Sequence, residues 1–232
     1  MTEKTALVIG ASRGLGLGYV KELARRGWTV IATARDPAAA TDLAALANGS
    51  QGAVSVRQLD STDRAGLDRL AAGLQGTTLD LLMVVAGISG PTGDELAAPD
   101  DRIAEVFLTN AVAPVRIAET LKGRVRDGSG VIAMITSGLG SVGSPPPMPG
   151  VVLYKASKAA LNSMTRSFIM TLGDRKLTVL SVSPGWVRTD MGGPAAPLSV
   201  EQSAQGVIDL VEAKAGTRAH GFYGVQGETI PW

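Results

Sequence analysis

Tyr154 and Lys158 stand four positions apart in the stretch Tyr154-Lys155-Ala156-Ser157-Lys158, which has the pattern of the first turns of a helix. Positions i and i+4 of a helix lie on one face, so the phenol and the ammonium can point into one site. A nearby ammonium favours the phenolate and lowers the pKa of the phenol, which would make Tyr154 a proton donor near neutral pH. The alternative is an ordinary helix with a buried tyrosine and a solvated lysine, and the spacing alone is a weak motif.

A glycine-rich turn follows the first apolar run of the chain. The run from Thr5 to Ile9 is typical of a strand buried on both faces of a parallel sheet, and a helical pattern extends from the turn to about Arg26. Glycines at such a junction let backbone N–H groups and the helix dipole approach a pyrophosphate. A turn that only permits close packing is the alternative, but the position at the first strand-to-helix junction favours nucleotide binding. The turn residues are Gly10, Ala11, Ser12, Arg13, Gly14, Leu15 and Gly16.

The end of the second predicted strand, residues 28–34, bears on the choice of dinucleotide. Arg35 stands where an acidic residue would bind the ribose hydroxyls of NAD, and Arg13 lies within the glycine-rich turn. Both guanidinium groups suit a 2′-phosphate. They could instead be solvated surface charges, and Asp36 could take the acidic role. The sequence favours NADPH over NADH.

Further apolar runs predict strands over residues 54–59, 79–85, 131–136 and 177–183. Predicted helices over 37–47, 62–74, 100–126, 151–172 and 200–214 separate or follow them, and residues 221–230 could add a last strand. Ligands of open parallel sheets bind outside the carboxyl ends of the strands. The residues at those ends are therefore candidates for the site: Asp60, Ser61, Ala86, Gly87, Ser137, Pro184, Gly185, Val187 and Thr189.

Several of these candidates have specific expected contacts. The Asp60 carboxylate could accept a hydrogen bond from an adenine amino group, or it could cap the next turn. Ala86 and Gly87 lack bulk, so a ribose could lie against their backbone. Ser137 is positioned for chemistry, although a serine at the start of a loop is usually a turn residue.

The long helix predicted over residues 100–126 contains Asn110 and, four residues later, Pro114. Asparagine is mildly unfavourable in mid-helix, and a proline implies a kink. Together they predict a break at which backbone groups and an amide face inward, with an exposed asparagine as the alternative.

Composition excludes several classes of protein. The chain has no cysteine and one histidine, His220, so we expect no disulfide, no thiolate chemistry and no metal site. A formal charge of +1 without a basic run gives nucleic-acid binding no support. We find no signal peptide and no apolar run of membrane-spanning length, and we expect a cytoplasmic protein. Without a linker or repeat, residues 1–232 are expected to form one domain.

The glycine-rich turn, Ser137, the Tyr154 and Lys158 pair and Pro184-Gly185 together resemble the short-chain dehydrogenase/reductase family. The resemblance spans nearly the whole chain, and the motifs come in the family's order. It implies an α/β fold, a single-domain Rossmann-type doubly wound parallel sheet of about seven strands with helices on both faces. It also implies a nicotinamide cofactor across the strand ends.

The same resemblance assigns catalytic roles. In the direction of reduction, Tyr154 would give a proton to the substrate oxygen while hydride moves to the carbonyl carbon, and Ser137 would hydrogen-bond that oxygen. Lys158 would lower the Tyr154 pKa and hold the nicotinamide ribose, and Asn110 would anchor a water that links Lys158 to solvent. Residues 184–189 would close over the nicotinamide, with the Val187 backbone near the carboxamide.

The resemblance also gives two sets of contacts. The predicted cofactor contacts are Gly10, Ser12, Arg13, Gly14, Leu15, Gly16, Arg35, Asp60, Ser61, Ala86, Gly87, Tyr154, Lys158, Pro184, Gly185, Val187 and Thr189. The predicted substrate pocket is lined by Ser89, Gly90, Leu139, Val142, Met148, Trp186 and Met191. This lining is apolar, which favours uncharged ketones or aldehydes, although Arg188 near the mouth weakens the argument.

Residues 184–193 and the ending Ile230-Pro231-Trp232 resemble the small carbonyl-reductase-like members of the family related to the C-factor and sniffer proteins. The chain departs from the family pattern where Ile9 replaces a threonine and Val84-Val85 replaces two asparagines, and apolar packing is expected to compensate. The stretch between Ser137 and Tyr154 is longer than usual, so residues 144–150 are expected to form a lid or pocket wall.

A dinucleotide-binding sensor or signalling protein without turnover is the competing function. The complete set of Asn110, Ser137, Tyr154 and Lys158 argues against it, because a pure binder needs no proton donor. We expect a homodimer or homotetramer. Apolar positions on the helix over 151–172 could form the contact or could all face the sheet: Leu161, Met164, Phe168 and Leu172.

Overall fold

Short runs of apolar and β-branched residues form most of the strands, and polar residues interrupt the runs of β3 and β7. The computed structural model describes residues 4–144 and 150–232. The strands are β1 (Thr5–Ile9), β2 (Thr29–Ala34), β3 (Val54–Gln58), β4 (Leu81–Val84), β5 (Val131–Ile135), β6 (Thr178–Val182) and β7 (His220–Tyr223). The α-helices are α1 (Gly14–Arg25), α2 (Thr41–Gly49), α3 (Arg64–Gly73), α4 (Asp100–Phe107), α5 (Ala113–Leu121), α6 (Val152–Ile169) and α7 (Val200–Lys214). Shorter helices are η1 (Glu95–Ala97), the π-helix η2 (Leu108–Val112), η3 (Lys122–Arg124) and η4 (Gly138–Gly140).

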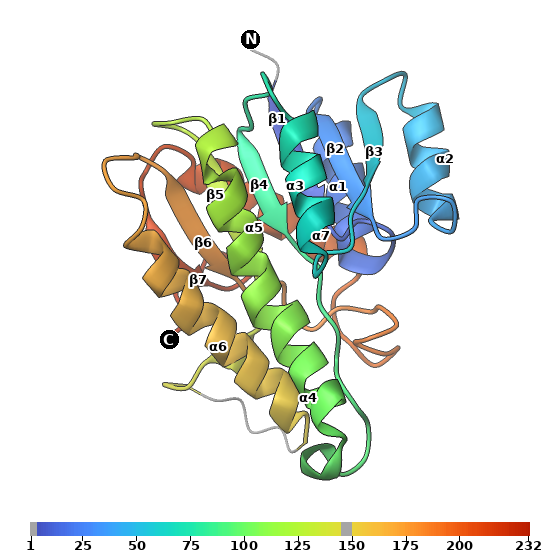
Figure 1. Ribbon diagram of the computed structural model, residues 1–232, viewed down its shortest axis with the longest axis vertical. Helices are drawn as coiled ribbons and strands as arrows, with labels where there is room; N and C mark the ends of the chain where they lie inside the picture. Colours follow the sequence, from blue (N-terminus) through green and yellow to red (C-terminus); the bar gives the residue numbers. More distant parts are fainter. Residues whose placement is uncertain (1–3, 145–149) are drawn as a thin grey trace.

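The strands pair in the order β3-β2-β1-β4-β5-β6-β7, and every pairing is parallel (Figure 1). The chain moves outward from β1 to β3, returns to lie beside β1 as β4, and then moves outward to β7. The order therefore reverses between β1 and β4, which is the switch point where ligands of doubly wound sheets bind. The predicted Rossmann-type sheet is confirmed.

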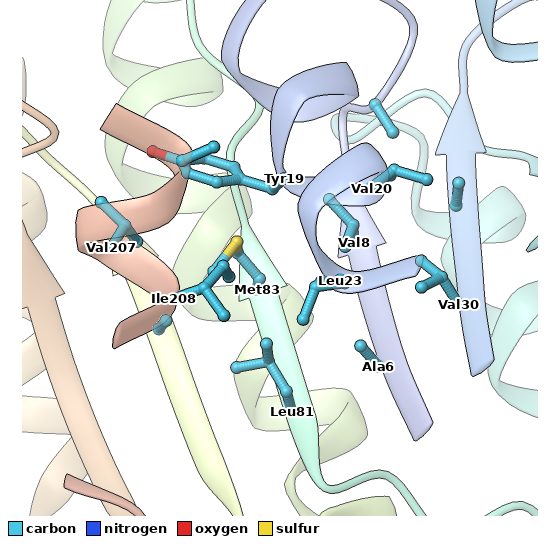
Figure 2. Close-up of a cluster of buried hydrophobic side chains, with 14 of the residues drawn as sticks. Ala6, Val8, Tyr19, Val20, Leu23, Val30, Leu81, Met83, Val207 and Ile208 are labelled. Atoms are coloured by element: carbon cyan, nitrogen blue, oxygen red, sulfur yellow. The ribbon is translucent and has the colours of Figure 1, made fainter. Parts of the chain in front are cut away.

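Alternation along the strands divides the core between the two faces of the sheet. Successive strand residues point to opposite faces, so Ala6 and Val8 of β1 belong to one buried cluster, whereas Leu7 and Ile9 belong to the other. Helices α1 and α7 cover the first cluster, and Tyr19 of α1 lies among its largest side chains (Figure 2). Helices α3, α5 and α6 cover the second (Figure 1).

Two of the three predicted apolar replacements, Ile9 and Val84, lie together in the second cluster, whereas Val85 packs against the first. Ile9 and Val84 are partners in the register of β1 and β4, and both are buried. The backbone N–H of Val85 donates to the Ile9 carbonyl at 2.9 Å. Backbone bonds and packing thus join the two central strands at this point.

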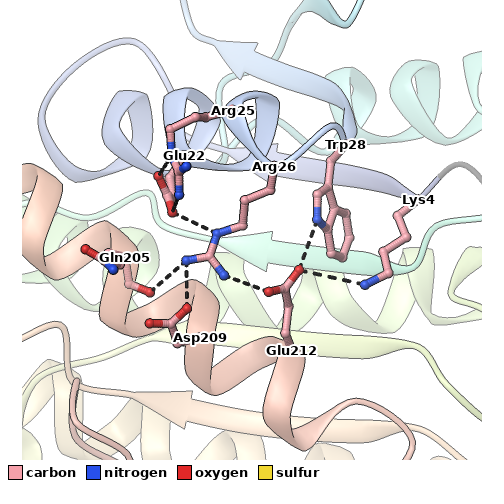
Figure 3. A network of polar contacts seen from close by, with 8 residues as sticks. All are labelled: Lys4, Glu22, Arg25, Arg26, Trp28, Gln205, Asp209 and Glu212. Carbon is pink, nitrogen blue, oxygen red and sulfur yellow. Dashed lines mark hydrogen bonds and ion pairs between the residues drawn. The ribbon is translucent and has the colours of Figure 1, made fainter.

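A polar network fixes α1 against α7 (Figure 3). The Arg26 guanidinium, just after α1, pairs with Glu22 at 2.7 Å and with Asp209 and Glu212 of α7 at 2.7 and 2.6 Å. Hydrogen bonds from Arg25, and then from Arg26, hold the pKa of Glu22 at about 2. Because α1 begins at the glycine-rich turn, this network helps to hold that turn in place.

Two predicted helices differ from the observed ones. The helix expected from Pro37 begins at Thr41, because the Asp36 carboxylate accepts hydrogen bonds from the backbone N–H groups of Ala38 and Ala39 and holds a turn there. The helix expected over 100–126 divides into α4, η2, α5 and η3, with its break at Asn110 as predicted. Within the part of the chain that the structure describes, we find no helix with the length and apolarity needed to cross a bilayer.

Candidate active site

A cavity of about 870 Å³ lies at the carboxyl ends of the strands. Its wall includes residues that directly follow β1, β2, β4, β5 and β6, together with residues of the turn after β3. The volume lies within the range of about 300–1,000 Å³ that is typical of ligand pockets. The sheet edge expected from the sequence is therefore the edge that is hollowed.

The glycine-rich turn forms the floor of the cavity and has no room for side chains at two positions. A Cβ on Gly10 would lie 2.8 Å from the Ala86 backbone, and the φ of Gly10 is +87°. A Cβ on Gly16 would lie 2.0 Å from the Gly10 carbonyl oxygen. Thr33 of β2, which is fully buried, accepts a hydrogen bond from the Gly10 N–H at 3.1 Å. The turn therefore runs tightly from β1 into the N-terminus of α1, as a phosphate-binding turn must.

Both candidate arginines line the cavity, and so does Asp60. Arg13 forms an ion pair with Asp190, which lies across the cavity on the segment after β6. The Asp36 carboxylate is bound within its own turn, which weighs against the acidic role considered for it. Asp60 accepts hydrogen bonds from the backbone N–H and the hydroxyl of Thr62 at 2.9 and 2.8 Å, so it caps the following turn.

The predicted acid, Tyr154, lines this cavity, whereas the predicted serine, Ser137, does not border it and lies next to Tyr154. Tyr154 lies in the first turn of α6, and its side chain hydrogen-bonds that of Ser137. Ser137 Oγ also accepts a hydrogen bond from the Leu139 N–H at 3.2 Å. Lys158 is buried on the same helix, with its Nζ 5.7 Å from the Tyr154 ring centroid, and it donates to the Ile135 carbonyl at 3.0 Å.

The pKa of Tyr154 differs from the one that the sequence predicts. Burial raises the pKa of Tyr154 above its usual value, and the hydrogen bond with Ser137 lowers it in part. The predicted lowering by Lys158 is not found, and the burial of the phenol is the largest influence on the Tyr154 pKa. Burial lowers the pKa of Lys158 to about 8. Lys158 is therefore the group of the pair that changes charge closest to neutral pH.

Asn110 lies in the π-helix η2 and is fully buried. Its Oδ1 accepts a hydrogen bond from the Ile88 N–H at 2.8 Å, and its Nδ2 donates to the Ile88 carbonyl at 2.8 Å and to Ser157 Oγ at 3.0 Å. Ser157 Oγ in turn donates to the Tyr154 carbonyl at 2.7 Å. The predicted inward-facing amide is confirmed, and it connects the loop after β4 to the helix that carries Tyr154.

Most of the predicted cofactor contacts border the cavity. The residues on its wall are Gly10, Ser12, Arg13, Gly14, Leu15, Gly16, Arg35, Asp60, Ser61, Ala86, Gly87, Tyr154, Lys158, Pro184 and Thr189. Gly185 and Val187 are not on the wall. Val187 is buried in a bridge to Leu198, and a Cβ on Gly185 would lie 2.5 Å from the Leu198 side chain. These two residues instead pack the segment after β6 against its own continuation.

The residues predicted to line the substrate pocket agree less well with the wall of the cavity. Only Met191 lines the cavity, and Met148 lies outside the described residues. The remaining predicted residues, Ser89, Gly90, Leu139, Val142 and Trp186, do not border it. Trp186 is half exposed, and its Nε1 donates to the Gly192 carbonyl at 2.8 Å. The Arg188 guanidinium donates to the carbonyls of Ala196 and Pro197.

Sequence reasoning missed one wall of the cavity. It is formed by Asp101, Ala104, Glu105, Leu108 and Thr109, from α4 and the start of η2. All five follow the i, i+3, i+4, i+7, i+8 spacing of one helical face, which was the available signal. Thr33 and Ser157 had no such signal, because their roles depend on strands and helices distant in the sequence. Among residues 4–144 and 150–232 we find no group of acidic or histidine side chains that could hold a metal ion.

Comparison with protein families identifies a match over residues 4–197 to the model described as short chain dehydrogenase. An oxidoreductase of Schizosaccharomyces pombe is 31% identical over 100% of this chain and 99% of its own. The C-signal protein of Myxococcus xanthus is 33% identical over 66% of this chain and 93% of its own.

Solved structures agree with this match along the whole chain. A Burkholderia multivorans protein with bound NADP is 37% identical with a TM-score of 0.94, and 100% of each chain is covered. A carbonyl reductase from Pseudomonas aeruginosa in complex with NADP is 40% identical with a TM-score of 0.90, again over 100% of each. The carbonyl reductase Sniffer of Drosophila melanogaster is 27% identical with a TM-score of 0.89 over 100% of each.

Proposed function

The chain belongs to the short-chain dehydrogenase family, and we propose that it reduces small uncharged ketones or aldehydes to alcohols, reversibly, with NADPH as the hydride donor. The observation that carries the proposal is the hydrogen bond between Tyr154 and Ser137 beside the cavity, with Lys158 buried on the same helix. A phenol, a second hydroxyl and a buried ammonium are suitable groups for moving a proton to a carbonyl oxygen.

The residues of the cavity fit a dinucleotide. The tight turn at Gly10 and Gly16 brings bare backbone to the N-terminus of α1, where a pyrophosphate is favoured by unpaired N–H groups and the helix dipole. The first turn of α1 carries no acidic residue that would oppose an anion there. The small residues Ala86 and Gly87 line the wall next to this turn.

Two guanidinium groups support a preference for NADPH. Arg13 and Arg35 both line the cavity, and they follow β1 and β2, which are neighbours in the sheet. Arginine binds phosphate in a bidentate manner, whereas the carboxylate that would bind a free ribose hydroxyl, Asp36, is held in its own turn. The solved Burkholderia and Pseudomonas proteins contain NADP, which is consistent with this preference.

In the proposed reduction, Tyr154 donates its phenolic proton to the substrate oxygen as negative charge develops there, and Ser137 donates a hydrogen bond to the same oxygen. When bound, the cofactor supplies the hydride. Lys158 would hold the ribose hydroxyls next to the reacting centre. A pKa of about 8 leaves Lys158 positively charged at pH 7, so its ammonium can donate hydrogen bonds to these hydroxyls.

Asn110 and Lys158 support the proposed replacement of that proton. A Cβ on Gly87 would lie 3.2 Å from Asn110 Oδ1 and 3.5 Å from Lys158 Nζ, so both polar atoms border one small volume. The volume is kept clear by glycine. A water held there could connect Lys158 to solvent, as the resemblance to the family implies.

We further propose that two copies of the chain associate through α5 and α6. A groove of about 380 Å³ lies between these helices and is lined in part by Val112, Val115 and Met164. The other apolar residues named from the sequence, Leu161, Phe168 and Leu172, are buried within the chain's own core, and of these Phe168 also lines the groove. Light scattering coupled to size-exclusion chromatography tests this association.

The experiment that tests the proposed function is NADPH oxidation by the purified protein with a panel of aldehydes, diketones and quinones, repeated with NADH. We expect turnover with uncharged carbonyl compounds and a lower KM for NADPH than for NADH. Binding of NADPH without turnover on any member of the panel would favour a dinucleotide-binding sensor instead.

A further inference from the structure

The C-terminal segment, defined as Ile230, Pro231 and Trp232, lies against the loop that follows Ser137 (residues 138–144). Ser141 is almost completely buried, and its hydroxyl donates a hydrogen bond to the Pro231 carbonyl at 2.6 Å. The Gly143 N–H donates to the Trp232 carbonyl at 2.8 Å. A Cβ on Gly143 would lie 3.1 Å from that oxygen, so the two backbones are in close contact.

The segment is itself anchored to two elements of the fold. The Trp232 ring lies 5.7 Å from the ring of Phe222, a buried residue of β7, and the Arg166 guanidinium of α6 lies 5.6 Å from the Trp232 ring centroid. The Ile230 N–H donates to the Phe222 carbonyl at 2.8 Å. In Figure 1 the C-terminus accordingly lies beside β7 and α6, the helix that carries Tyr154.

The opposite side of the loop is held by α6. The Asn162 side chain donates to the Gly140 carbonyl at 3.3 Å, and a Cβ on Gly140 would lie within 2.9 Å of Lys158 atoms. The loop is therefore fixed between the helix of the catalytic pair and the C-terminal segment. Its first turn, η4, includes Leu139, whose N–H donates to Ser137 Oγ.

We propose that Trp232 is a positioning residue for the carbonyl substrate. By holding residues 141–143 it keeps η4, and with it the Ser137 hydroxyl, at the distance from Tyr154 that lets both reach one substrate oxygen. Displacement of Ser137 would weaken the hydrogen bond that orients the substrate oxygen before reaction, so we expect the loss in the KM for the carbonyl substrate. This inference rests on the proposed function for the identity of the substrate, but the contact between segment and loop is independent of it.

Trp232→Ala is the direct test, and Trp28→Ala is its matched control. Trp28 is also a tryptophan beside a cation, Lys4, but it lies in the network between α1 and α7, away from the loop. For Trp232→Ala we expect a rise of about tenfold in the KM for the carbonyl substrate, an NADPH Kd within about twofold of wild type, and faster amide hydrogen exchange in residues 138–143. For Trp28→Ala we expect lower stability with wild-type KM and wild-type exchange in the loop.

If Trp232→Ala does not fold, Ser141→Ala tests the contact between the loop and the C-terminal segment. It removes the hydroxyl that donates to the Pro231 carbonyl and that also accepts a hydrogen bond from the Ser144 N–H. It should change KM and loop exchange in the same direction by a smaller factor, and Trp232→Phe should restore most of the wild-type KM. Unchanged exchange in residues 138–143, or equal changes in KM for Trp232→Ala and Trp28→Ala, would overturn the proposal. If the wild-type protein turns over no carbonyl compound, the proposed function fails, and the exchange measurement alone decides whether the segment orders the loop.

Discussion

Asn110 holds Ile88 by both of its backbone groups: Oδ1 accepts from the Ile88 N–H, and Nδ2 donates to the Ile88 carbonyl, each at 2.8 Å. Ile88 lines the cavity two residues after Ala86. The third bond of the amide reaches Ser157 of α6. The break in the helix between α4 and α5 thus lets one side chain connect the loop after β4 to α6.

Asn110→Leu should destabilise the fold, because it leaves both backbone groups of Ile88 without their partners. An unpaired buried polar group costs about 1–3 kcal/mol, so we expect a loss of roughly 2–4 kcal/mol in urea unfolding. Asn162→Leu is the matched control: Asn162 is also buried, but it donates a single hydrogen bond of 3.3 Å, and its Oδ1 has no partner within the described structure. Equal losses for the two variants would contradict the role given to Asn110.

Tyr154→Phe should lower kcat by about 10²–10⁴-fold, the usual contribution of a general acid. The NADPH Kd, measured by fluorescence titration, should stay within about twofold, because the phenyl ring and its packing remain. Ser137→Ala should lower kcat by a smaller factor. Retention of full activity by Tyr154→Phe would remove Tyr154 as the acid.

Arg35→Ala should raise the Kd for NADPH by about 10–100-fold, since a hydrogen bond to a charged group contributes about 1.5–3 kcal/mol. The Kd for NADH should not change. Arg124→Ala is a suitable control, because Arg124 lies in η3, before β5 and therefore at the opposite edge of the sheet. An equal rise in the Kd values for NADPH and NADH would show that Arg35 does not bind the 2′-phosphate.

Lys158→Met should make the fold more stable at pH 7 although it removes activity. Burial lowers the Lys158 pKa from 10.5 to about 8, so the unfolded chain binds more protons between these pH values, and this group makes stability rise with pH across that window. At pH 7 the folded state carries the full cost, roughly 3 kcal/mol at about 1.4 kcal/mol for each unit of pKa. The lost hydrogen bond to Ile135 offsets about 1 kcal/mol of the gain.

Urea unfolding from pH 7 to 10.5 tests this prediction. The stability gap between Lys158→Met and wild type should narrow as pH rises, whereas the exposed Lys21→Met variant should show no such trend. If the difference in unfolding free energy between the two proteins does not depend on pH, the buried charge is not its cause.

Ile9→Thr should lower the melting temperature, because Ile9 is buried in the second cluster opposite Val84. Ile9→Val, which removes one methylene without adding a hydroxyl, should cost about 0.5–1.5 kcal/mol, and the threonine should cost about 1–3 kcal/mol more. Differential scanning calorimetry measures both. A marked rise in melting temperature for the threonine variant would disprove compensation by apolar packing.

Strands β1, β4 and β5 were predictable because each is a continuous apolar run. The last strand was expected over residues 221–230 but covers His220–Tyr223, where polar and small residues interrupt the pattern. The helix break was predictable because asparagine and proline are both unfavourable within a helix. The start of α6 was predicted without its cause: the Glu95 carboxylate accepts hydrogen bonds from the N–H groups of Val152 and Leu153 at 3.1 and 2.9 Å. No local pattern reveals a cap that comes from another part of the chain.

The candidate site also contains residues that the sequence predicts and residues that it does not. The glycine turn, Tyr154 and Lys158 follow from local spacing, and the structure places them at one cavity. The substrate-side residues, such as Val142 and Trp186, lie in irregular segments where no periodicity gives the direction of a side chain. The pKa of Tyr154 depends on the burial of the whole site, which residue spacing does not express.

The wall of the cavity draws on residues from Ile9 to Met191. A nascent polypeptide therefore has no complete dinucleotide pocket until most of its length has left the ribosome, and the early strands must fold without help from bound nucleotide. Once the last contributing segment is in place, ligand binding adds to the stability of the finished molecule only. The cofactor would then protect the mature protein against unfolding and degradation in the cell, and it would give incomplete chains no such protection.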